Sequence, residues 1–156
     1  MNNPLSILRF LWRSRRPSRI GDMPAAADAF WLGKGYAALT FFGTIVTATK
    51  EEAAHINSHD DELKRHEMIH LMQARDTHDS WVCFYLLYIY YYLRALPMNR
   101  RLRNAAYLLN PFELEAYAHM HDAHYLECPE CGRQWRVYAR MKSSERLRFF
   151  LRRRVR

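Results

Sequence analysis

Two histidines and a glutamate at fixed spacing are the residues of this 156-residue chain best placed to do chemistry. His66, Glu67 and His70 form the pattern His-Glu-x-x-His. On an α-helix, side chains four residues apart lie on one face, so both imidazoles can reach the same point in space. Neutral imidazole nitrogens bind Zn²⁺ at about 2.0–2.1 Å. The pattern therefore predicts a zinc site, at which Glu67 would be the general base for a metal-activated water.

The motif needs a helix, and the surrounding sequence predicts one over residues 59–75. Ser58 followed by Asp61 is similar to a capping box, and acidic residues in a first turn are favoured by the helix dipole. The segment also has an apolar surface to bury, so both histidines are expected to point inward. Its apolar residues are Leu63, Met68, Ile69, Leu71 and Met72.

A third ligand is expected on a later helix. Asn110 and Pro111 predict its start, because asparagine is a favoured N-cap and proline a favoured first helical residue. This helix carries Glu113 and Glu115, which point to different sides because they are two residues apart. Gln73, one turn beyond the motif, is expected to pack beside the site or support a ligand rather than bind the metal.

With these residues the sequence resembles the gluzincin zinc metallopeptidases, in which a glutamate from a later helix completes the His-Glu-x-x-His site. The stretch from Glu113 to Ala116 is similar to the Glu-x-x-Ala-Asp segment of the HtpX-like and prenyl-protein peptidases, whose first glutamate binds zinc. The chain also looks like small bacterial proteins that join His-Glu-x-x-His-x-x-Gln to a downstream Asn-Pro-Phe-Glu-x-Glu-Ala-Tyr helix. This likeness covers residues 30–126.

The resemblance implies Glu113 as the third ligand, with Glu115 as the alternative. In those families an aspartate four residues after the ligand supports a zinc-binding histidine, and here that position is Tyr117. If Glu115 were the ligand, His119 would take the supporting position.

The segment before the motif predicts strands. Residues 29–32 and 36–49 flank a glycine-containing turn at 33–35, which is typical of a β-hairpin. The second run is uncharged between residues 38 and 47, so it should be covered on at least one face and could pair with a substrate peptide. Gly43 suggests a bulge within this run or the close approach of another backbone. Residues 50–57 are expected to be a polar connection.

Together these features predict an α+β fold. A β-hairpin or small sheet would pack against the His-Glu-x-x-His helix and two or more further helices, as the resemblance to a zincin-like domain implies. One of these helices is the tyrosine-rich run 81–93, which is shorter than the roughly 18–20 residues of a membrane span and is expected to be buried. The predicted organisation is a basic amphipathic arm at 1–20, a zincin-like metallopeptidase domain at 21–127, and a knuckle and basic tail at 128–156.

The knuckle is the sequence Cys-Pro-Glu-Cys-Gly, whose thiolates are Cys128 and Cys131. It resembles the half-sites of zinc ribbons and rubredoxins, and with His121 or His124 it could form a second, structural Cys₂His₂ zinc site. A partner chain could equally complete it, and the alternative is a simple turn with two free thiols.

Charge is concentrated at the two ends of the sequence. Residues 1–20 and 133–156 carry formal charges of +5 and +9 out of a net +8, which leaves −6 for the residues between them. Such ends could contact an anionic membrane surface, nucleic acid or an acidic partner. Three cysteines and the absence of a recognisable signal peptide or membrane span favour a cytoplasmic location, with a membrane-peripheral one as the alternative.

The sequence therefore predicts a zinc-dependent peptidase acting on a peptide or protein substrate. One rival hypothesis is a non-catalytic zinc-binding interaction module. The other is a basic protein that binds nucleic acid or a membrane surface, in which the His-Glu-x-x-His motif is incidental. Nothing in the sequence indicates an oligomeric state.

Overall fold

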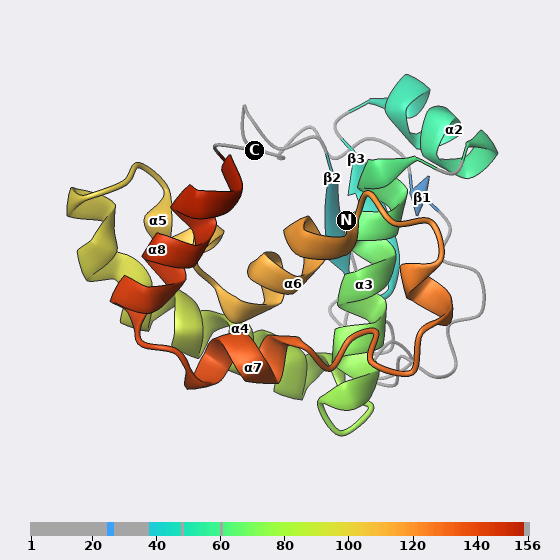
Figure 1. Ribbon diagram of the computed structural model, residues 1–156. Coiled ribbons are helices and arrows are strands. Elements are labelled where there is room, and N and C mark those ends of the chain that lie inside the picture. The colour runs from blue at the N-terminus through green and yellow to red at the C-terminus, as the bar shows by residue number, and fades with distance from the viewer. Residues whose placement is uncertain (1–24, 27–37, 48, 60, 155–156) are drawn as a thin grey trace, which may run out of the picture.

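The computed structural model describes residues 25–26, 38–47, 49–59 and 61–154, and in these parts the chain is mostly helical with one small sheet (Figure 1). This is the predicted α+β class. The predicted arm at 1–20 and the predicted strand and turn at 29–35 lie outside the described residues. The elements are β1 (Ala25–Ala26), β2 (Ala38–Phe41), β3 (Thr44–Thr47), α2 (Lys50–Ser58), α3 (Glu62–Asp76), α4 (Trp81–Ala95), α5 (Ala105–Leu108), α6 (Pro111–His119), α7 (Trp135–Arg140) and α8 (Ser143–Arg154), with 3₁₀ turns η2 (Leu96–Arg100) and η3 (Tyr125–Glu127).

The sheet has the order β1-β3-β2, with β1 parallel and β2 antiparallel to β3. The prediction of one strand through Gly43 with a bulge is wrong, because the chain reverses there. Phe42 and Gly43 have φ values of 48° and 84°, and two positive φ values are what a two-residue type I′ turn requires. Phe42 is held in this conformation by its backbone N–H, which donates to the Tyr85 hydroxyl at 3.1 Å.

The predicted polar connection at 50–57 is also wrong, since these residues form α2. Thr49 and Glu52 make a reciprocal capping box at its start, and Ala53 and Ile56 are its buried residues. The Ser58 hydroxyl bonds back within α2, so it does not cap the next helix. The side chain of Asp61 caps α3 instead, by accepting from the Lys64 N–H, and α3 begins three residues later than predicted.

Helix α3 contacts the sheet through β2 and also contacts α4 and α6 (Figure 1). The core joins the hairpin, α2, α3, α4, α6 and α7. Its buried members include Ile45, Ile56, Leu71, Trp81, Phe84, Phe112 and Trp135. Among the described helices, none is long and apolar enough to cross a membrane.

The C-terminal residues pack onto this body rather than forming a solvated tail. Trp135 of α7 stacks on Phe112 of α6 with ring centroids 4.6 Å apart. Gly132 of the knuckle lies directly against the backbone of Met72 in α3. Gly132 and Trp135 therefore help to hold α3 and α6 together.

Candidate metal centre

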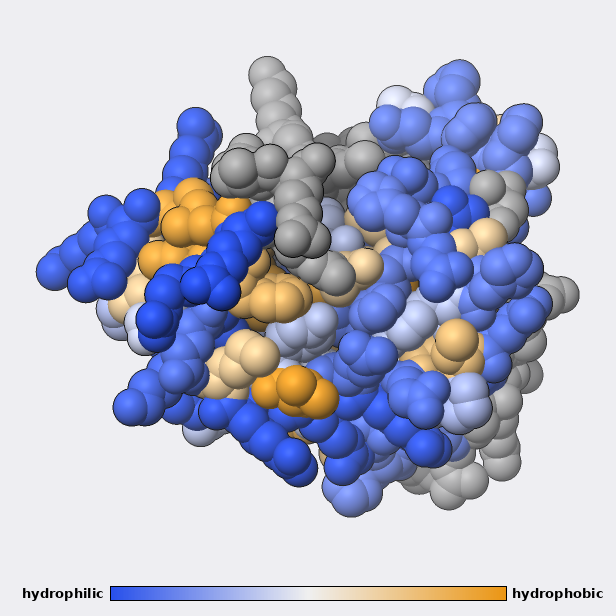
Figure 2. All heavy atoms as spheres, in the orientation of Figure 1, coloured by the Kyte–Doolittle hydropathy of each residue, from blue (hydrophilic) through white to orange (hydrophobic). Residues whose placement is uncertain are grey.

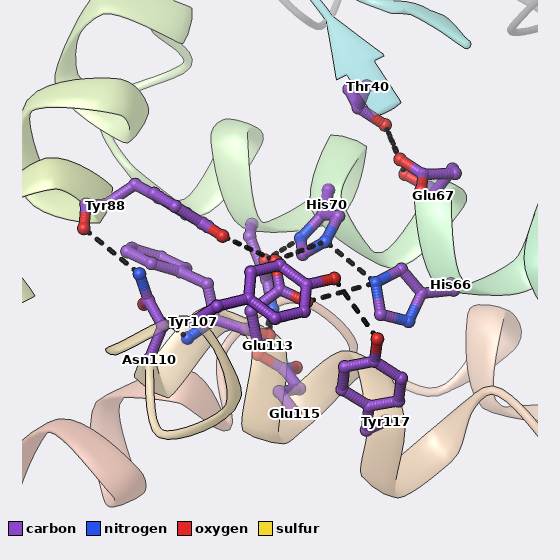
Figure 3. Close-up of polar contacts among 12 residues, drawn as sticks. Thr40, His66, Glu67, His70, Tyr88, Tyr107, Asn110, Glu113, Glu115 and Tyr117 are labelled. Atoms are coloured by element: carbon purple, nitrogen blue, oxygen red, sulfur yellow. Dashed lines mark hydrogen bonds and ion pairs between the residues drawn. The ribbon is translucent and has the colours of Figure 1, made fainter. Parts of the chain in front are cut away.

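His66 and His70 of α3 meet Glu113 of α6 in the interior of the protein (Figure 3). The three side chains are buried, with 5%, 6% and 3% of their surface exposed. The Nε2 atoms of the two histidines are 3.2 Å apart. Glu113 Oε2 lies 3.3 Å from His66 Nε2, and Glu113 Oε1 lies 3.5 Å from His70 Nε2. The helix expected from the sequence thus carries both imidazoles to one point, where the three residues could hold a metal ion.

Gln73 determines which nitrogen of His70 is available. Its amide nitrogen donates to Phe112 O at 2.9 Å and to Glu115 Oε2 at 3.0 Å, so both of its protons are used. Its oxygen then faces His70 Nδ1 at 2.8 Å and must accept a proton from it. When His70 is neutral, as metal binding requires, it is therefore held in the tautomer whose Nε2 carries a free lone pair directed at the site.

Glu115, the alternative ligand, points away from the histidines. Its fully buried carboxylate accepts a hydrogen bond from the Gln73 amide and one from the Tyr125 hydroxyl, the latter at 2.9 Å. It also accepts from the backbone N–H groups of Gln134 and Trp135, at 3.2 and 2.8 Å. The structure thus brings Glu113, and not Glu115, to the two histidines. Glu115 instead supports the site indirectly, because it anchors the glutamine that orients His70.

The Glu113 carboxylate is only partly satisfied by protein donors. Its Oε1 accepts from the Tyr88 hydroxyl at 2.7 Å. Its Oε2 is buried and, within the described residues, accepts no hydrogen bond. A buried anionic oxygen without a donor is costly, and a cation between it and the imidazoles would satisfy it. The donor set therefore fits a metal ion.

The metal-free site is electrostatically coupled. Burial disfavours the imidazolium, yet the Glu113 carboxylate beside it raises the pKa of His70 to about 9. Burial likewise opposes ionisation of Glu113, but His70 and His66 more than compensate and hold the pKa of Glu113 well below its usual range. At neutral pH the metal-free pair is therefore a buried imidazolium and carboxylate.

The metal-free protein is expected to lose stability as the pH rises. A histidine whose pKa is raised from 6.5 to about 9 stabilises the fold fully below pH 6.5, and that contribution disappears between pH 6.5 and 9. Glu113, whose pKa is lowered, contributes above its ordinary value of 4.5 and loses its contribution in acid. We expect a maximum between these limits and a fall of up to about 3 kcal/mol by pH 9. Chemical denaturation of chelator-treated protein across this range would measure it, and a flat profile would contradict the assignment.

Glu67 is buried beside the two histidines but belongs to a different contact. Its carboxylate accepts a hydrogen bond from the hydroxyl of Thr40, which is itself buried in β2. Figure 3 shows this pair to one side of the His66, His70 and Glu113 cluster. Glu67 is thus a carboxylate next to the ligands that is not one of them.

Tyrosines from three elements border the site. Tyr88 of α4 holds Glu113, as described above. The Tyr117 ring packs edge-on against His66 with centroids 4.7 Å apart, and its hydroxyl contacts that of Tyr107 at 3.2 Å. Tyr117 occupies the position of the supporting aspartate in the families resembled, and the contact shown here with His66 is between rings. Burial raises the pKa of Tyr107, so its hydroxyl remains a hydrogen-bond donor.

The second predicted metal site is not assembled. In the parts of the chain that the structure describes, Cys128 and Cys131 form no group of three or more ligands with His121 or His124. His121 contacts Glu62 at 2.7 Å, and exposed His124 faces Glu127. Burial raises the pKa of the Cys131 thiol to about 12. The knuckle packs against α3 and α6 instead.

The group of His66, His70 and Glu113 was therefore predicted from the sequence, whereas most of the residues that contact it were not. Thr40, Tyr88 and Tyr107 were not predicted individually. Comparison of the chain with protein-family models, curated proteins and solved structures gives no match.

Proposed function

We propose that this protein is a zinc-dependent peptidase with a zincin-like arrangement, in which His66, His70 and Glu113 bind Zn²⁺ and Glu67 is the general base. The spacing of the ligand atoms carries this proposal. Ligands 2.0–2.1 Å from a tetrahedral ion lie about 3.3 Å from one another. His66 Nε2 lies 3.2 Å from His70 Nε2 and 3.3 Å from Glu113 Oε2, while the 3.5 Å contact of His70 is to the other carboxylate oxygen, Oε1. One ligand atom from each of the three residues lies within 4.8 Å of the others.

The roles of the residues follow from their contacts. A zinc ion bound there would acidify a water molecule and polarise a carbonyl group. Glu67 would accept the proton of that water and pass it to the leaving amine. Thr40 would hold the Glu67 carboxylate in one orientation while it does so. The Tyr107 and Tyr117 hydroxyls, which face the same cluster, would donate to the developing oxyanion.

The sheet supports a peptide substrate. The sequence suggested residues 38–47 as one pairing edge, but β3 is paired on both sides. Among the described strands, β2 is the outer strand that contacts α3. An extended peptide adding to β2 would lie next to Thr40 and thus near Glu67. This placement favours peptide bonds over small-molecule substrates.

Metal analysis of the purified protein tests the proposal. We expect about one zinc per chain in the wild type, none in His66→Ala or Glu113→Ala, and slow cleavage of an unstructured protein such as casein by the wild type alone. A folded wild type that takes up no zinc would overturn the whole proposal. Zinc binding without cleavage would instead favour the non-catalytic zinc module, for which the replacement of the supporting aspartate by Tyr117 is the specific observation.

Gln73→Met should weaken zinc binding without removing a ligand. Methionine fills a similar volume but cannot accept from His70 Nδ1 or donate to Glu115, so His70 loses its fixed tautomer. Loss of such support typically costs about 10–100-fold in metal affinity. Competition with a zinc chelator measures it.

Gln134→Met is the matched control for this variant. The Gln134 side chain contacts His119, and only its backbone N–H, which the substitution retains, reaches Glu115. We expect unchanged zinc affinity. If zinc affinity fell equally in both variants, the hydrogen bonds that link Glu115 through Gln73 to His70 would not be what supports zinc binding.

A further inference from the structure

Helix α4 has a second apolar face that points away from the core. Val82, Leu86, Ile89 and Leu93 are between 51% and 64% exposed, and Leu96 at the start of η2 is 39% exposed. Their spacing of four, three, four and three residues places them on one line along the helix. The core-facing residues of the same helix, such as Trp81 and Phe84, are fully buried. We call the five exposed residues the α4 stripe.

The surroundings of the α4 stripe are basic and aromatic. No acidic residue occurs between positions 80 and 112, whereas four arginines do, all exposed: Arg94, Arg100, Arg101 and Arg103. Tyr90 and Tyr92, which are also exposed, border the stripe. Arg94 donates to the Tyr90 hydroxyl at 3.1 Å and lies over its ring.

Helix α8 adds charge at the same end of the molecule. Its Leu147 and Phe150 pack on the small cluster formed by Ala95, Ala105, Ala106 and Leu109, next to the end of α4. Arg148 and Arg152 of α8 are exposed, so they add positive charge on the helix that packs next to the end of α4. Figure 2 shows hydrophobic surface bordered by strongly hydrophilic side chains over the α5 and α8 end.

We propose that the α4 stripe and the arginines at its end dock this protein on an anionic membrane surface. Aliphatic side chains would enter the boundary between head groups and acyl chains, tyrosines would lie at the head-group level, and arginines would pair with anionic lipid head groups. The charge of the two ends suggested a membrane-peripheral location as one alternative. The present proposal assigns the membrane contact to a surface that includes α4. The proposal does not depend on the metal site or on peptidase activity.

Charge complementarity favours lipid over the other occupants of such a face. A second copy of the chain would bring another acid-free stripe, which offers no partner to the arginines. A nucleic acid would pair with the arginines but would leave the aliphatic stripe in water. An anionic bilayer meets both requirements, because its surface is negative and its boundary region is apolar.

Co-sedimentation of the full chain with vesicles tests the proposal. We expect the wild type to bind phosphatidylcholine vesicles that contain phosphatidylglycerol, and to bind pure phosphatidylcholine weakly. Leu86→Gln combined with Ile89→Gln should lower partitioning at least about tenfold, because two exposed side chains lose their apolar burial. Arg100→Gln combined with Arg101→Gln should lower partitioning onto the anionic vesicles about fivefold for each arginine. The difference between this variant and the wild type should vanish in high salt.

Val137→Gln is the matched control, because Val137 is 55% exposed on α7 outside the stripe. It should bind as the wild type does, and all of the substituted side chains are exposed, so circular dichroism should show unchanged folding. Failure of the wild type to bind anionic vesicles would overturn the proposal, and so would undiminished binding by the stripe variant. A wild-type dimer that the stripe variant converts to a monomer, without vesicle binding, would identify a second copy as the occupant and also overturn it.

Discussion

Glu67→Gln is expected to bind zinc as the wild type does and to lose peptide hydrolysis by about 10²–10⁴-fold. The ligand cluster consists of His66, His70 and Glu113, so the amide removes no ligand. It can still accept the Thr40 hydrogen bond through its oxygen, which preserves the contact between β2 and α3. What it cannot do is take up a proton at the pH of the reaction. Zinc content and casein cleavage measured on the same preparation test this separation.

Substitutions at Thr40 provide the graded comparison. Thr40→Val keeps the Glu67 carboxylate but removes the hydroxyl that orients it, so we expect a smaller fall in kcat with little change in KM. Thr40→Ser, which restores the donor, should recover most of the rate. If Glu67→Gln cleaves as fast as the wild type, Glu67 is not the base. If it loses zinc, the carboxylate has a role in assembling the site that the structure does not show.

The three candidate ligands could be predicted because the way they come together depends on local spacing. His66 and His70 are one helical turn apart wherever the helix lies, and Asn110 with Pro111 starts a helix that presents Glu113 from its first turn. Only the choice of Glu113 over Glu115 as the third candidate ligand drew on the family resemblance. These are properties of short segments, and short segments are what sequence patterns describe well.

The supporting residues could not be predicted in the same way, because each depends on where distant segments come together. Thr40 reaches Glu67 only because the chain reverses at Phe42 and Gly43, and that turn is stabilised by Tyr85 of α4. The wrong prediction of a bulge at Gly43 arose because an apolar run of this length is consistent with one strand or with two.

The place of the C-terminal charges also depends on how distant segments come together. A count along the sequence cannot show that α8 packs through Leu147 and Phe150 beside the end of α4. The tyrosine-rich run 81–93 was correctly predicted as a helix, and α4 continues two residues further, to Ala95. Its burial was predicted only in part, because a run that is apolar all round gives no indication of which face the core will take.

Gly132→Ala is expected to destabilise the protein by about 3 kcal/mol or more and to weaken zinc binding as well. Gly132 has a φ of 76°, in the left-handed region that disfavours a side chain. A Cβ there would lie 2.3 Å from the carbonyl carbon of Met72 and 2.6 Å from its Cβ and oxygen. Those atoms belong to α3 or are attached directly to its backbone, so they cannot move aside without distorting the helix that carries both histidines.

The effect on zinc follows from what the knuckle positions. Displacing Gly132 moves the N–H groups of Gln134 and Trp135, which hold Glu115, and Glu115 in turn holds the Gln73 amide that orients His70. Chemical denaturation and chelator competition should therefore both change in Gly132→Ala. Glu130→Ala, at an exposed position of the same knuckle, should leave the free energy of unfolding within about 0.5 kcal/mol of the wild type. A Gly132→Ala protein of wild-type stability would mean that the knuckle does not lie against α3, whereas a destabilised protein with unchanged zinc affinity would confine the knuckle to a structural role and separate it from the metal centre.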